Sequence, residues 1–373
     1  MDRRRFLNRA GIAGAALAAG ACARQEDCAP AAGGSTAPAD EVREWKMVTS
    51  WPKNFPGLGT AANEVAESIT RLSGGRINVT VYGANDLVPA FEVFDAVSSG
   101  TVEIGHSAAY YWKGKDPAAQ FFGSVPFGLT AMEMNGWLYF GGGMALWRRL
   151  YERFDLVPFA AGNTSVQMGG WFNKEINSVA DLSGLKMRIP GLGGEVLARA
   201  GGVPVNLPGG ELFTALESGT IDATEWVGPY NDLAFGLFRA ARYYYYPGWH
   251  EPGTALETIV HKPVFEALPD DLKAIVEAAC NRTNDRLMAE YAARNAQALT
   301  PLVEEHGVEL RRFPDDVLAR LREISDQVID EVAGDDPLAR EIHDSFVAYR
   351  DSSRRFLRLS DGAYFGALGL TSG

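Results

Sequence analysis

Arg188 is placed where a guanidinium group could hold an anion. It belongs to the segment Leu-Lys-Met-Arg-Ile-Pro, and its neighbours Met187, Ile189 and Pro190 are typical of a strand end that enters a rigid turn. A guanidinium offers two parallel N–H donors that match the two oxygens of a carboxylate, and it stays charged when buried. The alternative is a surface salt bridge, worth only about 0–1 kcal/mol, and residue type alone favours that alternative.

The charge of the whole chain limits the partners that such an arginine could serve. The sequence has 373 residues and a formal net charge of −12, which argues against nucleic acid as a partner. An anionic ligand would therefore need positive charge concentrated around it.

The residue types that commonly carry catalysis are scattered along the sequence. Among the five histidines, His106 and His250 lie near aromatic segments, but neither belongs to a serine or cysteine arrangement that suggests nucleophilic catalysis. The sequence contains no G-x-S-x-G, H-E-x-x-H or P-loop motif. Of the three cysteines, Cys22 and Cys28 lie near the amino terminus and Cys280 stands alone. They cannot build a disulfide framework or a cysteine metal site.

The elements that must position these residues follow an α/β pattern. Strands are predicted at 45–50 and 77–82, and helices at 60–72 and 91–98. This alternation predicts an α/β fold with a parallel sheet. Two long helices are predicted farther on, at 270–305 and at 314–359, and the second is interrupted near 334–337. They are expected to brace or span the domains, or to form a dimer contact.

An internal repeat indicates two domains of related topology. Residues 89–103 align with residues 208–222, with identical Pro, Glu, Phe, Ala, Ser, Gly and Thr at matched positions. Each copy is predicted to form a helix, a Ser-Gly-Thr turn and a short strand. Ligands of open α/β sheets bind outside the carboxyl ends of the strands, so the segments 106–112 and 224–232 are expected to line a shared cleft. An ordinary helix-to-strand connection is the alternative interpretation.

The amino terminus has the plan of an export signal. Three arginines followed by Phe6-Leu7 precede an apolar run at 10–21, which is too short and too rich in Ala and Gly for a membrane span. The arginines resemble a twin-arginine signal, which predicts export to the periplasm, with a chance basic start as the alternative. Cys22 lies at a site similar to that of bacterial lipoproteins, although Ala19 replaces the usual leucine. We therefore expect a signal peptide at 1–22, lipid attachment at Cys22 as one alternative, and a flexible tether at 23–43.

From about Trp45 to Leu359 the sequence resembles the periplasmic receptors of tripartite ATP-independent (TRAP) transporters. The segments that carry this resemblance are 91–97, 184–191, 207–211 and 225–229. Leu-Lys-Met-Arg-Ile-Pro is the most specific of them, because the family places an almost standard arginine there. The second half is similar to the branch that binds 2-oxo and 2-hydroxy monocarboxylates, such as pyruvate or lactate, together with Na⁺ or Ca²⁺.

The resemblance implies the two-domain α/β fold of periplasmic solute-binding proteins, with a hinge, an inter-domain cleft and long C-terminal helices. Residues 44–163 with parts of 250–310 would form lobe I, and residues 164–250 would form lobe II. Helices within 311–360 would pack across the lobes or in a homodimer. The protein partner would be the membrane permease subunits of a TRAP transporter.

The resemblance also implies a binding site in which Arg188 holds the carboxylate of the ligand. Gln167, Glu225, Trp226 and Glu251 would hold the cation through an amide oxygen, carboxylates and a backbone carbonyl, which are ligands that hard cations prefer. The cation would neutralise the carboxylates, so that an acidic site could accept an anion. Two glutamates favour Ca²⁺ over Na⁺. The alternative is that both are ordinary surface acids.

Aromatic side chains in the same segments are candidates for the wall of the site. A small acid needs one or two hydrogen-bond donors within a close apolar surround. Tyr110 and Tyr111 follow the first repeat copy, and Tyr111 is expected to be the better hydroxyl donor. Asn163 is expected to add a hydrogen bond to the substrate. For Trp112 and Trp171, packing in the core is an equal alternative.

Two classes of function remain at this point. The first is a receptor without catalysis, in which two lobes close around a small organic acid and deliver it to the permease. The second is an exported metal-dependent enzyme, a lyase or hydrolase that acts on a small carboxylate with Glu225 as its base. For the enzyme, the sequence offers no evident general acid to accompany Glu225. A flexible tether also suits the capture of a ligand better than its catalytic turnover.

Overall fold

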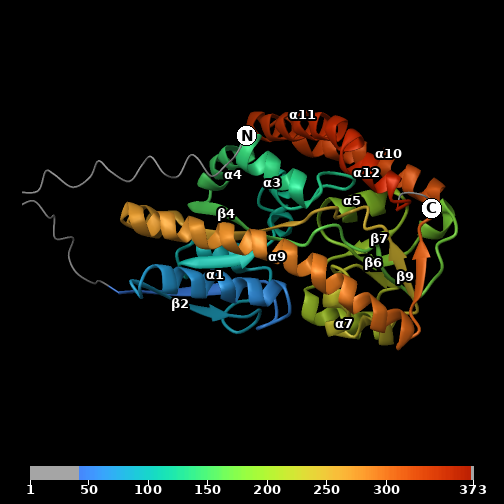
Figure 1. Cartoon of the computed structure of the whole chain (residues 1–373), viewed down its shortest axis with the longest axis horizontal. Coiled ribbons are helices and arrows are strands. Elements are labelled where there is room, and N and C mark those ends of the chain that lie inside the picture. Colours follow the sequence, from blue (N-terminus) through green and yellow to red (C-terminus); the bar gives the residue numbers. More distant parts are fainter. Residues whose placement is uncertain (1–41, 371–373) are drawn as a thin grey trace, which may run out of the picture. The chain divides into compact units, whose positions relative to one another are not determined.

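The computed structural model describes residues 42–370. The predicted signal peptide, the candidate lipid attachment at Cys22 and the tether before residue 42 lie outside this range. From Val42 onward the chain forms one compact unit that contains two β-sheets and the helices around them (Figure 1). Between residues 42 and 370, no helix has both the length and the apolar character needed to cross a membrane.

The first sheet is built mainly from the amino-terminal part of the described chain. Its order is β2 (Ile77–Tyr82), β1 (Arg43–Thr49), β3 (Ile104–Ser107), β10 (Ala255–His261) and β4 (Leu156–Asn163). Strand β1 is parallel to β2 and β3, whereas β10 is antiparallel to both β3 and β4. Helix α1 (Leu58–Leu72) buries one face through Leu58, Ala61, Val65 and Ile69, which recur at helical spacing. Helix α2 (Val93–Ser98) precedes β3.

The second sheet consists of six shorter strands. Its order is β11 (Glu309–Arg312), β9 (Tyr243–Tyr246), β5 (Gly170–Phe172), β8 (Ala223–Thr224), β6 (Lys186–Arg188) and β7 (Val203–Val205). Strand β6 is parallel to β7 and β8, and β5 is antiparallel to β8 and β9. The helices along this part of the chain are α5 (Gly191–Arg199), α6 (Leu212–Glu217) and α7 (Pro229–Phe235). Strand β11 joins this sheet although it lies outside residues 164–250.

The internal repeat of the sequence is also a repeat of structure. Each copy forms a helix, a turn and a strand: α2 leads to β3 in the first sheet and α6 leads to β8 in the second. The amide of Val102 donates to the carbonyl of Ala96, and the matched pair Ile221 and Ala215 makes the same bond, both at 3.2 Å. The glycine of each Ser-Gly-Thr turn has a positive φ, 71° and 72°, which explains why glycine stands there.

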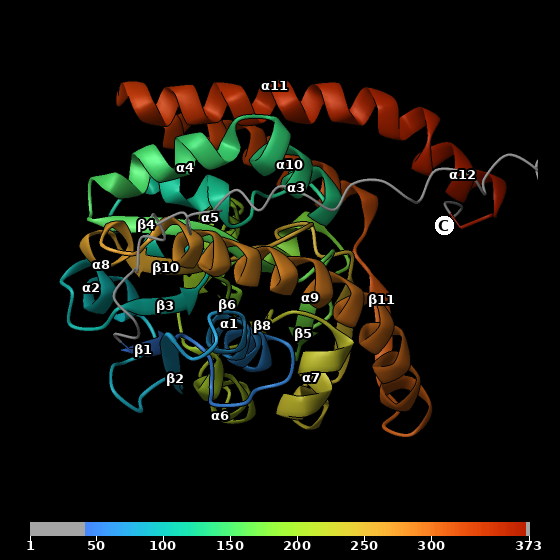
Figure 2. The ribbon, with the colours of Figure 1, turned by 60° about the vertical axis from the view of Figure 1, so that its left-hand side comes forward.

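Helix α9 (Asp270–Glu304) runs the length of the unit. It packs against β4 and α1 beside the first sheet and against α7 beside the second (Figures 1 and 2). It begins after Pro269, and Asp270 and Asp271 in its first turn suit the positive end of the helix dipole. The sequence-predicted helix over 270–305 is therefore confirmed to within one residue.

The C-terminal helices pack on other helices of the unit. Helix α10 (Asp315–Ala333) packs on α5, and α11 (Pro337–Leu359) packs on α3 (Ala131–Phe140) and α4 (Gly143–Glu152) (Figure 2). The predicted interruption lies between them, where Gly334 has a positive φ and the side chain of Asp336 caps α11. A last short helix is α12 (Asp361–Ala367).

Short helical turns complete the part of the chain described. They are η2 (Ala109–Trp112), η3 (Pro117–Phe122), η4 (Val179–Leu182), η5 (Gly209–Glu211), η6 (Leu237–Arg239) and α8 (Lys262–Glu266). The turn η2 follows β3 directly, so it lies at the carboxyl end of that strand, where the sequence predicts the cleft.

Candidate functional site

Arg188 and Glu225 are brought together by the register of two neighbouring strands. Strand β6 ends at Arg188, and β8 ends at Thr224, the residue paired with Arg188 in the parallel ladder. The amide of Glu225 donates to the carbonyl of Arg188 at 3.2 Å, so both side chains leave the same carboxyl edge of the sheet. This edge is where open α/β sheets bind ligands.

The guanidinium of Arg188 is buried, and each of its three nitrogens has a hydrogen-bond partner. Only 1 % of the residue is exposed, which rules out the surface salt bridge that residue type alone favoured. Nε donates to the carbonyl of Leu207 at 3.0 Å, Nη1 donates to the carboxylate of Glu225, and Nη2 donates to the hydroxyl of Tyr111 at 3.3 Å. Burial opposes the charge of Arg188, but the attraction of Glu225, Tyr111, Tyr110 and Glu251 together outweighs it, and the net effect is a raised pKa of Arg188.

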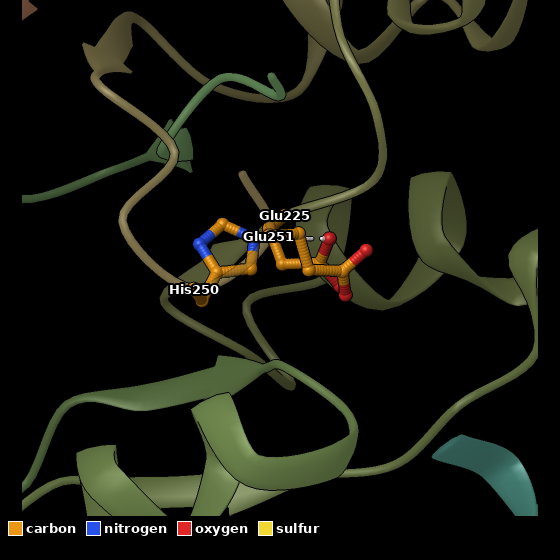
Figure 3. A group of neighbouring side chains, drawn as sticks. All are labelled: Glu225, His250 and Glu251. Carbon is orange, nitrogen blue, oxygen red and sulfur yellow. Dashed lines mark hydrogen bonds and ion pairs between the residues drawn. The ribbon is translucent and has the colours of Figure 1, made fainter. Parts of the chain in front are cut away.

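Three buried side chains form a compact cluster beside this ion pair. One potential ligand atom from each of Glu225, His250 and Glu251 lies within 4.8 Å of the other two (Figure 3). Nε2 of His250 lies 3.4 Å from Oε2 of Glu225. His250 and Glu251 come from the loop that follows β9, whereas Glu225 follows β8. The sequence prediction that Glu225 and Glu251 lie close together is therefore met in three dimensions.

Gln167 completes the oxygen-rich side of the cluster. Its Nε2 donates to Oε2 of Glu251 at 2.8 Å, and the hydroxyl of Thr254 donates to the same oxygen at 2.5 Å. The other end of the amide, Oε1 of Gln167, is buried and finds no hydrogen-bond partner among residues 42–370. A buried acceptor without a partner is costly, and an ion or ligand at this point would satisfy it.

The electrostatics of the cluster fit a cation. Burial and the negative charge of Glu225 raise the pKa of Glu251 to about 7. Two carboxyl groups held close in a site shielded from water repel one another, and a positive ion between them would remove that penalty. Carboxylates and an amide oxygen are the donors that Ca²⁺ and Na⁺ accept. The residues present therefore fit the hard cation that the sequence predicts.

The tyrosines of η2 reach the same site from the first sheet. Tyr111 contacts Arg188 through its hydroxyl, and the ring of Tyr110 lies edge-on to that of Tyr111 at 4.7 Å. Burial raises the pKa of Tyr110, and the charges of Glu251 and Glu225 raise it further. Both tyrosines therefore lie between the two sheets, beside the ion pair.

Asn163 is engaged elsewhere. Its Nδ2 donates to the carbonyl of Gly253 at 3.1 Å, and its Oδ1 accepts from the amide of Ser165 at 2.9 Å. Both ends of the amide are thus bonded to the segments that connect the two sheets. The structure brings Arg188, Tyr111 and the cation cluster together. Asn163 instead bonds the segments that connect the two sheets.

The tryptophans that the sequence left ambiguous belong to the core. The indole of Trp112 donates to the buried carboxylate of Glu257. Trp171 stacks on Tyr244 with ring centroids 4.1 Å apart. Neither the hydrogen bond of Trp112 nor the stacking of Trp171 involves the cluster around Glu225, so core packing is the correct interpretation for both tryptophans.

Two residues of the site were not predicted from the sequence. Trp51 follows β1, and its ring lies 6.1 Å from that of Tyr111 and 6.3 Å from that of Trp226. Its position after the carboxyl end of a parallel strand was an available signal. His250 was considered only as a catalytic group, although its position next to Glu251 indicated a place in the same site.

His106 supports the side chain of Trp51. The indole N–H of Trp51 donates to Nδ1 of His106 at 2.9 Å, so Nε2 carries the proton and faces the carbonyl of Ala161 at 3.3 Å. Burial lowers the pKa of His106 to about 4, and the ring is therefore neutral near pH 7.

Comparison with known proteins places the chain in a family. Residues 47–335 match the family described as bacterial extracellular solute-binding protein, family 7, also called DctP. A monocarboxylate 2-oxoacid-binding periplasmic protein of Nostoc sp. is 42% identical over 364 residues, which is 98% of each chain.

Two crystal structures of TRAP periplasmic solute-binding proteins are also similar, each 42% identical with a TM-score of 0.85. One, from Pseudoalteromonas atlantica, has bound sodium and pyruvate; the match covers 87% of this chain and 99% of that one. The other, from Colwellia psychrerythraea, has bound calcium and pyruvate, with 88% and 100% covered. These matches confirm the predicted two-domain α/β solute-binding fold. This chain belongs to the DctP family of bacterial extracellular solute-binding proteins.

Proposed function

We propose that this protein is the extracytoplasmic receptor of a TRAP transporter and binds a small 2-oxo or 2-hydroxy monocarboxylate, such as pyruvate or lactate, together with a metal cation. The observation that carries the proposal is the buried Arg188–Glu225 pair next to Glu251 and Gln167. This arrangement brings a guanidinium that suits a carboxylate and an oxygen-rich cluster that suits a cation together among buried side chains. The ligands of the two similar crystal structures support it.

The proposed division of labour follows from the charges. Arg188 holds the carboxylate of the acid, and the hydroxyl of Tyr111 adds a hydrogen bond from the other sheet. Oε1 of Gln167, the carboxylates of Glu225 and Glu251 and the carbonyl of Trp226 hold the cation. When bound, the cation supplies the positive charge that lets two carboxylates and an anionic ligand share one site.

Ca²⁺ is the cation that we propose, with Na⁺ as the second candidate. Two carboxylates compensate the charge of a divalent ion, and calcium accepts a larger number of oxygen ligands than its competitors for such a site. Both ions occur with pyruvate in similar proteins, so the choice depends on the ligands of this chain.

The proposed transport cycle requires the two sheets to separate. Arg188 and Glu225 are almost fully buried. Tyr111, which follows a strand of the first sheet, contacts the guanidinium of Arg188 at the edge of the second sheet. An acid therefore enters and leaves only when the lobes open, and the closed form is what the permease recognises. We propose lobe I as 44–163 with parts of 250–310, lobe II as 164–250, and the helices of 311–360 as a brace or homodimer contact.

The location that we propose is the periplasm. Export would use the twin-arginine signal at residues 1–22, and lipid attachment at Cys22 would tether the receptor to a membrane. The membership of an extracellular solute-binding family supports this location.

A binding experiment separates this function from an exported lyase or hydrolase. Protein stripped with EDTA is mixed with pyruvate, with Ca²⁺ or with both, and unfolding is followed while NMR reports the fate of the pyruvate. A receptor gains about 2.7 kcal/mol of stability when ligand is present at 100 times its dissociation constant. We expect that gain in stability only when pyruvate and Ca²⁺ are both present. The NMR spectrum should show unchanged pyruvate at the end. Turnover of pyruvate, or no stabilisation by any combination of acid and cation, would refute the proposal.

A further inference from the structure

Asp232 is a buried carboxylate that lies behind the cation cluster rather than in it. Only 1 % of the residue is exposed, and its side chain forms no ion pair with any residue between 42 and 370. Burial raises its pKa to about 7. A lone buried carboxylate is unfavourable, so the bonds that it makes are expected to serve a purpose.

One oxygen of Asp232 is fixed by the second sheet. Oδ2 accepts from the indole Nε1 of Trp171 at 2.9 Å and from the hydroxyl of Tyr244 at 2.6 Å. Trp171 of β5 pairs with Tyr244 of β9 and, on its other side, with Thr224 of β8. One donor therefore comes from β5, which pairs with the residue directly before Glu225, and the other comes from β9, the next strand beyond β5.

The other oxygen of Asp232 is directed at the loop that carries the cation ligands. Oδ1 accepts from the amide of Val227 at 3.4 Å, and the carbonyl of Val227 accepts from the amide of Met168 at 3.0 Å. Val227 follows Glu225 and Trp226, and Met168 follows Gln167. Asp232 thus holds the segment that presents two of the four proposed cation ligands, Glu225 and Trp226.

We infer that Asp232 is a positioning residue for the cation site: its carboxylate ties the Glu225–Val227 loop to the sheet through Trp171 and Tyr244. The inference rests on the proposed function. A carboxylate is required because three donors converge on its two oxygens. An asparagine has one acceptor oxygen, so its NH₂ group would face either the amide of Val227 or the donors of the sheet.

The experiment measures cation and acid requirements separately, at pH 8 and with Ca²⁺ and pyruvate as probes. The variant Asp232→Asn keeps the shape of the side chain and loses one acceptor. We expect the Ca²⁺ concentration for half-saturation, at excess pyruvate, to rise about tenfold. At saturating Ca²⁺, pyruvate affinity should stay within about threefold of wild type, because Arg188 is untouched. A variant that merely weakens the fold would not separate these two quantities.

Two further variants keep the test decisive. Tyr244→Phe removes one donor to Asp232 and leaves the carboxylate in place, so it should raise the Ca²⁺ requirement in the same direction by about threefold. If Asp232→Asn does not fold, Tyr244→Phe alone tests the positioning role of Asp232. Glu257→Gln is the matched control: this carboxylate is also buried and bonded to a tryptophan and a tyrosine, but not to the cation loop.

The outcomes distinguish this inference from the function on which it rests. Failure of the wild type to bind pyruvate with Ca²⁺ would reject the proposed function. Wild-type binding with an unchanged Ca²⁺ requirement in Tyr244→Phe and in folded Asp232→Asn would reject the positioning role alone. An equal rise in Glu257→Gln would also reject it, since the effect would then belong to any buried carboxylate.

Discussion

The hydroxyl of Tyr111 lies 3.3 Å from Nη2 of Arg188 and accepts its hydrogen bond, although Tyr111 follows a strand of the first sheet and Arg188 ends a strand of the second. Tyr111 stands at the carboxyl end of β3 and Arg188 at the carboxyl end of β6. Their contact therefore joins the two edges at which open α/β sheets bind ligands. It also gives a direct way to test whether the site depends on both sheets.

Removal of the Tyr111 hydroxyl should weaken acid binding modestly. In Tyr111→Phe the ring remains and one hydrogen bond is lost, so we expect pyruvate affinity to fall about five- to tenfold, in line with about 1 kcal/mol for such a bond. Calorimetry in saturating Ca²⁺ measures this. Tyr243→Phe is the control, because that hydroxyl bonds the exposed Glu175 away from the site. Equal affinity in both variants would remove Tyr111 from the binding site.

Neutralising Glu251 should change the preference for the cation. Glu251→Gln removes one of two carboxylate charges, and divalent ions lose more by this than monovalent ions. We expect the Ca²⁺ requirement to rise at least about tenfold while the Na⁺ requirement changes less. Titration of each ion at excess pyruvate measures both, with Glu217→Gln on the exposed end of α6 as the matched control. A proportional loss for both ions would contradict a charge-selected site.

The stability of the cation-free protein should fall as pH rises toward neutrality. Burial raises the pKa of Glu257 to about 7, and its carboxyl accepts from Trp112 and Tyr151. Between its unfolded value near 4.5 and about 7, the folded state holds a proton that the unfolded state has lost. The contribution of this proton to the free energy of unfolding is therefore fully present below that window and disappears as pH rises through about 7. Asp232 and Glu251, also raised to about 7, act in the same direction.

Urea unfolding in EDTA from pH 5 to 8 tests that sign. One such proton changes the free energy of unfolding by about 1.4 kcal/mol per pH unit. Glu257→Gln should flatten the slope by up to that amount in the same window. A wild-type stability that rises from pH 5 to 7, or an unchanged slope in the variant, would show that these carboxyls titrate normally.

The sequence predicted the parts of this fold that depend on local patterns. The repeat identified two helix–turn–strand units because the Ser-Gly-Thr turn needs a glycine with positive φ, and both copies have it. The break between α10 and α11 was also predicted from local residue types, because Gly334 ends the first helix and Pro337 begins the second. Such signals lie within a few residues of the structure that they determine.

The parts that the sequence did not predict depend on contacts between distant segments. The assignment of β11 to the second sheet follows from its pairing with β9, which no local pattern records. Asn163 was predicted as a ligand-binding residue from its residue type, yet tertiary contacts engage both of its amide ends. Trp51 contacts Tyr111 and Trp226, which lie far from it along the chain, whereas His250 was indicated by its place next to Glu251 and was overlooked.

The most direct test of the account is the affinity of Arg188→Ala for pyruvate in saturating Ca²⁺. We expect a loss of at least about 100-fold, because the ligand carboxylate would face Glu225 without a guanidinium between them. Arg188→Lys should recover only part of it, since an ammonium lacks the fork. Arg242→Ala, an exposed arginine paired with Glu309, should bind as wild type. A folded Arg188→Ala protein with pyruvate affinity within about threefold of wild type would contradict the central claim.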